Sequence, residues 1–272
     1  MVRLDFIHGA LIAPTAAVFF AFFLYPLSKL LLISGSGANG WDTYWQALTT
    51  SRYLRSLGST VVLSSCVTLI TLFISGVSGV FLARNKFKGH ALLTALLTLP
   101  LAFPGVVIGF MIIMLGGRQG AVAWVSEAII GERLVFAYSL FGLFLGYVYF
   151  SIPRTILTII AAAEKLDYRL EEAARSLGAS TSQVTFDIII PALKPALIAS
   201  GAICFATAMG AFGTAFTLAT KIDVLPMVIY TEFTLQANIA MAATLSFILG
   251  LITWLVLVSA HSLAGSSIAA AA

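Results

Sequence analysis

Charged residues are scarce in this sequence. Only 10% of its 272 residues are Asp, Glu, Lys or Arg, whereas 60% are hydrophobic. A soluble globular domain carries more charge on its surface, so this composition excludes one and indicates an integral membrane protein. The apolar residues form long unbroken runs, not the alternating pattern of a membrane β-barrel. The predicted fold class is therefore all-α, as a polytopic membrane protein.

Cysteine, histidine and enzyme motifs are also rare or missing. The two cysteines, Cys66 and Cys204, lie inside apolar runs and are expected to be small buried residues. The three histidines form no cluster, so no metal site is predicted. Neither a Gly-Lys dipeptide nor a Gly-x-Ser-x-Gly elbow occurs, which excludes a Walker loop and a hydrolase nucleophile. We therefore predict no catalytic residue and no cofactor bound by this chain.

Six apolar runs are long enough to cross a membrane as helices. They cover approximately Gly9–Ile33, Leu57–Ala83, Ala91–Leu115, Leu134–Ile152, Ala192–Ala219 and Ile239–Ala260. Pro100 and Pro104 predict a kink in the third. Ile156–Ala163 is also apolar, and is either a helix packed under the membrane or an extension of the fourth span. We predict one transmembrane domain over residues 1–272, with a cytoplasmic loop over 153–191 between spans four and five.

The basic residues indicate the orientation of these spans. With both termini inside, the inner loops hold Arg3, Arg84, Lys86, Lys88, Arg154, Lys165, Arg169, Arg175 and Lys194. The outer loops hold Lys29, Arg52, Arg55, Arg118, Arg133 and Lys221. Because inner loops carry the excess of Lys and Arg, both termini and the loop before the fifth span are predicted to be cytoplasmic. The net charge is only +4 and the basic residues are scattered over short loops, so no nucleic-acid partner is predicted.

The polar loop has its own helix signals. Asp167 is expected to cap a short helix, within which Glu171 and Arg175 would form an i,i+4 pair. Gly178 is expected to end that helix in a left-handed turn.

A second short helix is expected to follow. Ser180 and Gln183 have the spacing of a capping box, and Pro191 is expected to end or bend the helix that the box opens. The ordinary interpretation of such a loop is an amphipathic helix lying on the membrane surface.

The spacing of the loop favours a more specific interpretation. Glu172-Ala173-Ala174 is followed after three residues by Gly178, and after nine more by Ile188, one residue and Ile190-Pro191. This resembles the "EAA" signature of the membrane subunits of binding-protein-dependent ABC importers, with Ile190 where the family has Leu. The general style is similar to permeases of the polyamine, sulfate, iron and phosphonate importers.

The resemblance implies a type I ABC importer permease in the bacterial inner membrane, forming half of the substrate path. The implied partners are two ATP-binding subunits that use ATP and Mg²⁺, a second permease expected to be a different chain, a periplasmic or lipid-anchored solute-binding protein, and membrane lipid. The implied coupling positions, with Glu172 as polar anchor against the ATPase, are Glu171, Glu172, Ala173, Ala174, Gly178, Ile188 and Pro191.

Candidates for the substrate path lie in the third and fifth spans. They are Phe103, Pro104, Met209, Gly210, Phe212 and Thr214. Small and hydroxyl-bearing residues are suited to a polar path, and equally to helix packing. Asp223 and Glu232 in the outer segment are expected to meet the binding protein.

Two other functions compete with the importer permease. A stand-alone secondary transporter or channel would need its own coupling site, and no ionisable residue is expected at the centre of a span. A structural scaffold would not need the Glu-Ala-Ala signature. Neither the charges nor the aromatic residues of the spans select a transported solute.

Overall fold

The structure is a computed structural model that describes residues 12–37, 40–218 and 223–264. Every regular element in these ranges is helical. The helices long and apolar enough to cross a membrane are Ile12–Ser34, Ser51–Arg84, Gly105–Ile130, Leu140–Glu164, Thr181–Met209 and Ile239–Leu263. The predicted all-α fold with six spans is therefore confirmed, although the third span differs from its predicted position.

Some of these spans combine several helical elements. Two of the elements, η1 and η3, are π-helices, and η2 is a 3₁₀-helix. In chain order the elements are η1 (Phe20–Leu24), α2 (Tyr25–Ser34), α3 (Asp42–Thr49), α4 (Ser51–Arg84), α5 (His90–Thr98), η2 (Leu99–Ala102), α6 (Gly105–Gly116), α7 (Ala121–Ile130), α8 (Leu140–Glu164), α9 (Tyr168–Ser176), α10 (Thr181–Gln183), η3 (Val184–Ile189), α11 (Ile190–Met209), α12 (Gly213–Leu218), α13 (Leu225–Thr234) and α14 (Ile239–Ala264).

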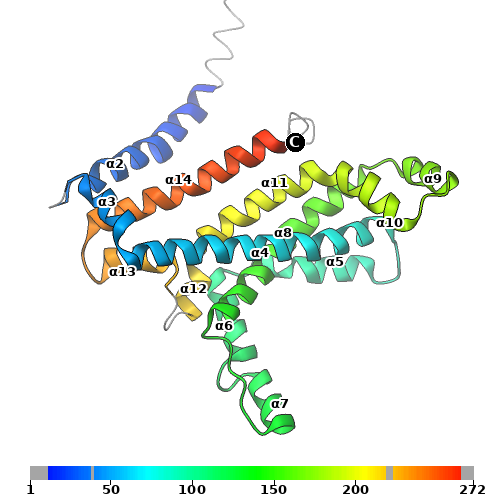
Figure 1. The fold of residues 1–272 in the computed structure, drawn as a ribbon, viewed down its shortest axis with the longest axis horizontal. Helices are drawn as coiled ribbons and strands as arrows, with labels where there is room; N and C mark the ends of the chain where they lie inside the picture. Colours follow the sequence, from blue (N-terminus) through cyan, green and yellow to red (C-terminus); the bar gives the residue numbers. More distant parts are fainter. Residues whose placement is uncertain (1–11, 38–39, 219–222, 265–272) are drawn as a thin grey trace, which may run out of the picture.

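The long helices α4, α8 and α11 pack side by side and form the centre of the molecule (Figure 1). Two glycines bring their backbones close together. A Cβ added at Gly79 of α4 would lie 2.9 Å from Ile159 Cγ2 of α8, and one added at Gly201 of α11 would lie 2.9 Å from Leu72 Cδ1 of α4. Because lipid tails are as apolar as the side chains, helices in a membrane are held together by close packing of this kind and not by the hydrophobic effect.

The predicted third span over Ala91–Leu115 is wrong, because the chain breaks in its middle. The helix ends at Ala102, Phe103 and Pro104 are extended, and α6 begins at Gly105. A proline lacks the N–H of the helical ladder and disfavours helical geometry in the residue before it, so Pro104 separates the two helices fully instead of kinking one. After the break, α6 and α7 project away from the central helices (Figure 1).

The fourth span continues further than predicted. α8 begins at Leu140 and passes through the buried Pro153 to Glu164, so Ile156–Ala163 is an extension of this span and not a separate helix. Arg154, predicted to be cytoplasmic, therefore lies inside the fourth span. This also corrects the expectation that no span contains a central ionisable residue.

The fifth span also differs from the prediction. A helical stretch over Thr181–Met209 does not end at Pro191, because the wider π-turns of η3 come directly before this proline. The helix instead ends at Met209, and α12 is a separate short helix after it. The prediction of one continuous span to Ala219 is therefore wrong, and Ala219 itself lies outside the described residues.

The remaining two spans lie together at one side of the molecule. α2 packs against α14, which also contacts α11 and α13 (Figure 1). Large apolar side chains such as Phe22 and Phe73 are 81% and 70% exposed, as expected for a surface in contact with lipid.

The prediction that both cysteines are buried holds for Cys204 but is wrong for Cys66, which is exposed.

Candidate coupling site

The predicted short helix of the loop is α9, and its ends are closed by local hydrogen bonds. Asp167 accepts from the Arg169 N–H at 3.0 Å. At the other end Gly178 has φ +87°, and the N–H groups of Gly178 and Ala179 donate to the carbonyls of Arg175 and Ala174, both at 3.0 Å. This pair of bonds is the Schellman arrangement. Both predicted caps are therefore present.

The predicted capping box at the start of the second helix is present as well. The Gln183 N–H donates to Ser180 Oγ at 3.3 Å, and the Ser180 N–H donates to Gln183 Oε1 at 2.8 Å. This capping box opens the long helix that includes α11, so α9 is joined to the fifth span by a single tight turn.

Glu171 does not pair with Arg175, as the sequence suggested, but with Arg84 at the end of α4. Its side chain is 7% exposed and that of Arg84 17%, and the Arg84 guanidinium also lies 5.3 Å from the ring centroid of Tyr168. Arg84 comes 87 residues before Glu171, so sequence spacing could not reveal the pair. The available signal was a basic residue in the last turn of the second span.

A small apolar cluster holds α9 against the ends of the spans. Ala174 and Ala179 pack on buried residues of α8, η3 and α11, namely Ala163, Val184, Ile189 and Leu193. The base of α9 is thus fixed by packing to the fourth and fifth spans, and by the ion pair to α4.

The tip and outer face of α9 have no cover. Leu177 is 89% exposed and Leu170 is 59% exposed. Glu172, Ala173 and Gly178 are exposed beside them. An exposed leucine among small residues at a helix tip is suited to a close contact with another protein.

The predicted coupling residues thus occupy different environments. Glu171 is buried in the ion pair, whereas Ala174 and Ile188 are half-buried in or beside the supporting cluster. The exposed members are Glu172, Ala173, Gly178 and Pro191.

The predicted path residues are brought together only in part. Thr214 is buried and its hydroxyl donates to the Gly105 carbonyl at 2.9 Å, which holds α12 against the start of α6, directly after Phe103 and Pro104. Met209 is fully buried in the packing. Gly210 is exposed and Phe212 is half-buried beside the rings of Phe216 and Tyr230.

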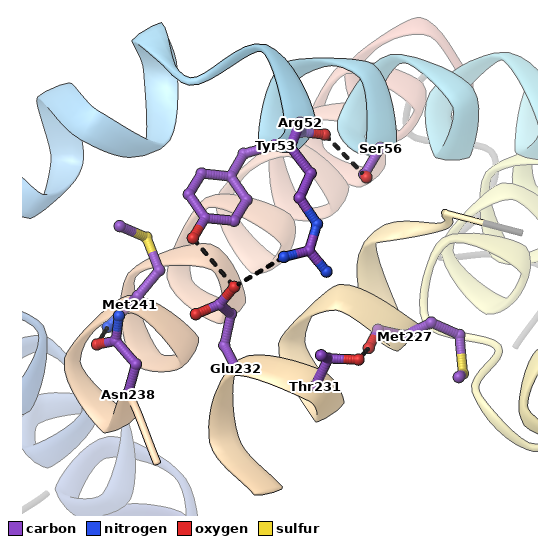
Figure 2. Close-up of polar contacts among 8 residues, drawn as sticks. All are labelled: Arg52, Tyr53, Ser56, Met227, Thr231, Glu232, Asn238 and Met241. Atoms are coloured by element: carbon purple, nitrogen blue, oxygen red, sulfur yellow. Dashed lines mark hydrogen bonds and ion pairs between the residues drawn. The ribbon is translucent and has the colours of Figure 1, made fainter. Parts of the chain in front are cut away.

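The outer segment does not present Glu232 to a binding protein. Glu232 of α13 is fully buried, and Figure 2 shows Tyr53 and Arg52 of α4 pointing toward it. The Tyr53 hydroxyl donates to Glu232 Oε1 at 3.0 Å, and Arg52 Nη1 lies 3.5 Å from the same oxygen. The predicted external role is wrong for Glu232, because this carboxylate ties α13 to α4. Asp223 is exposed.

The comparisons with known proteins agree on one family. A family model described as "Binding-protein-dependent transport system inner membrane component" matches residues 75–266, which include α9 and its supports. The molybdenum transport system permease protein ModB of Escherichia coli (strain K12) is 35% identical over 185 residues, covering 63% of this chain and 77% of the relative. The sulfate transport system permease protein CysT of the same organism is 30% identical over 237 residues, covering 82% and 81%.

A solved structure shows the same fold. In the crystal structure of a bacterial alginate ABC transporter in complex with alginate pentasaccharide-bound periplasmic protein, one chain matches with a TM-score of 0.81. The match covers 97% of this chain and 96% of that chain at 16% identity, so it concerns the fold alone.

Proposed function

Because this chain belongs to the family of binding-protein-dependent transport system inner membrane components, we propose that α9 is the element through which it is driven by ATP. The chain is a membrane permease subunit of an ABC importer and not an enzyme. The alternative of a stand-alone carrier or channel has no support from the family match.

One observation carries the coupling proposal: α9 is fixed at its base and bare at its tip. The base is held by the Glu171–Arg84 pair and by the cluster around Ala174, whereas Leu177 is 89% exposed. A force applied at the tip would therefore be passed to the ends of α4, α8 and α11 without α9 detaching. The exposed Glu172 and Ala173 would form the contact surface with the ATPase.

The proposal extends to the rest of the assembly. Two ATP-binding subunits using ATP and Mg²⁺ would dock on α9 and on its counterpart in a second, different permease. The two permeases would form one path, of which this chain supplies half. A solute-binding protein would deliver substrate on the outside, at the α13 end of the molecule. Both termini and the loop that carries α9, which follows the fourth span at Glu164, would face the cytoplasm.

The transported solute is proposed from the named relatives. ModB is named for molybdenum transport and CysT for sulfate transport. Sulfate is a tetrahedral oxyanion, and molybdenum in neutral water forms molybdate, an oxyanion of the same shape. We therefore assign this chain to an importer of such an oxyanion.

The assembly can be tested by weighing it. The tagged chain would be expressed with its native neighbours, extracted gently and analysed as an intact complex by native mass spectrometry. A mass that contains two ATP-binding subunits and a second permease is expected. Recovery of this chain alone, with transport activity retained in liposomes, would show that it is a self-sufficient carrier.

A further inference from the structure

Arg154 is a charged residue inside the fourth span, ten residues before its end at Glu164. Its Nη1 donates to Thr207 Oγ1 of α11 at 3.1 Å, and the Thr207 hydroxyl in turn donates to the Ile203 carbonyl at 2.7 Å. A small hollow beside it is lined by Phe150, Ser151, Thr155 and Cys204. Thr207 thus accepts from the guanidinium and holds it at the mouth of a partly polar hollow.

The position of Arg154 along the bundle places it at the level of the hydrocarbon core. α4 and α8 run in the same direction, and Gly79 of α4 is level with Ile159 of α8. Arg154 precedes Ile159 by five residues and Arg84 follows Gly79 by five, so the two arginines are separated by roughly 15 Å along the helix axes. The stretch of α4 without charged residues, 56–83, is only slightly longer than the roughly 20 residues that cross a hydrocarbon core about 30 Å thick, and the level of Arg154 falls within it, so Arg154 lies inside the core.

The charge of Arg154 is neither buried nor neutralised within the described residues. The side chain is exposed on the surface of this subunit, and no carboxylate in those residues lies within ion-pair distance of it. A lone arginine facing lipid at that depth is costly, and ionisable residues in spans face protein or a water-filled path instead. The exposed α8–α11 face around Arg154 and Thr207 must therefore face away from lipid.

We propose that Arg154 is a binding residue for the transported oxyanion, on the wall that this permease contributes to the substrate path. This inference rests on the proposed function. A guanidinium carries five N–H donors in a planar fork that matches two oxygens of an oxyanion, and only one of these donors is engaged by Thr207. Thr207 is a positioning residue, because its hydroxyl is used to orient the guanidinium.

The experiment compares variants of the complete importer in proteoliposomes, with molybdate and sulfate as the probes. Arg154→Gln is expected to lower the uptake of the transported anion by roughly 10- to 100-fold, the range for loss of a bidentate charged contact. Stimulation of the ATPase by the binding protein should persist. Arg154→Lys should lose less, because it keeps the charge without the fork. Arg118→Gln, which removes an exposed arginine from the turn after α6, is the matched control and should transport as wild type does.

The positioning role of Thr207 has its own readout. Thr207→Val should reduce uptake several-fold, and Thr207→Ser should restore it because the acceptor oxygen returns. A purely structural threonine would not show this rescue.

Three results would overturn the inference. Uptake by Arg154→Gln at the wild-type rate would remove the residue from the path. Separation of the two permeases in that variant would show that Arg154 instead pairs with an acidic residue of the second permease. A wild-type complex that moves neither anion, although its ATPase responds to the binding protein, would refute the oxyanion class while leaving the permease function intact. That function is judged separately, by whether ATP-binding subunits are present in the wild-type complex.

Discussion

Glu171 and Glu172 are adjacent residues with the same chemistry and opposite surroundings. Glu171 is 5% exposed and paired with Arg84, whereas Glu172 is exposed on the outer face of α9. One carboxylate therefore holds the helix in place, and the other is available to a partner. The signature spacing marks Glu172 but gives no indication that the preceding residue supports it.

This difference predicts separate effects of two matched substitutions. Glu171→Ala leaves the Arg84 charge without its partner, and breaking a buried pair in this way costs about 3–5 kcal/mol. Thermal unfolding in detergent should therefore begin at a clearly lower temperature in Glu171→Ala, with faster proteolysis at α9. Glu172→Ala should leave both measurements unchanged and reduce ATP-driven uptake. Equal stability of the two variants would contradict the assignment of Glu171 as a support.

Glu232 provides a second residue-scale prediction. Its Oε1 accepts from Tyr53, and its Oε2 has no hydrogen-bond partner within the described residues. Tyr53→Phe would leave the fully buried carboxylate with Arg52 alone, at a cost of about 1–3 kcal/mol. The melting temperature of the purified complex should fall accordingly. Tyr149→Phe, on a half-exposed tyrosine of α8, is the control, and a fall of the same size there would refute the role given to Glu232.

At the scale of the elements, α9 depends on its two ends more than on its length. A helix of nine residues is marginal in isolation, so the Asp167 cap and the Gly178 turn are needed to define it. Both ends were predictable, because caps depend on residues within a few positions of each other. The attachment of α9 to α4 was not predictable, because it joins distant parts of the chain.

The Gly178 turn can be compared with an equivalent turn elsewhere. Gly178 and Gly131 both end helices with positive φ, +87° and +75°, and an added Cβ would meet nothing within 4 Å at either position. A valine is therefore penalised only by the left-handed backbone, by about 1–2 kcal/mol. Gly178→Val should uncouple ATP hydrolysis from uptake, and Gly178→Asn, which tolerates this conformation, should largely preserve coupling. Gly131→Val, after α7, should leave coupling intact; uncoupling there would indicate a general folding defect.

Prolines mark the elements where local rules and the fold disagree. Pro104 ends a helix as expected for a residue without an N–H, whereas Pro153 and Pro191 lie in helical stretches that continue past them. Neighbouring helices support α8 on both sides of Pro153, and such packing is visible only in three dimensions. Treating Pro153 as a helix end also placed Arg154 in the cytoplasm, which concealed a charge inside the fourth span.

At the scale of the whole molecule, the number of spans followed directly from composition, because an apolar helix of about 20 residues matches the thickness of the hydrocarbon core. The caps of α9 followed from local spacing, and the family from the Glu172–Pro191 signature, which the comparisons support. What the sequence could not provide were the pairs across the fold: Arg84 with Glu171, Tyr53 with Glu232, and Arg154 with Thr207. Each joins elements whose relative positions depend on packing.

The most direct test of the central claim is a cross-link at the tip of α9. A photoactivatable group would be attached to Leu177→Cys in a chain lacking Cys66 and Cys204, with Leu235→Cys as the control. Leu235 is 73% exposed and follows α13, at the end of the molecule opposite α9 (Figure 1). We predict cross-linking of Leu177→Cys to the ATP-binding subunit and none from Leu235→Cys. Labelling of lipid alone from Leu177→Cys, or equal labelling of the ATPase from both positions, would contradict the coupling role of α9.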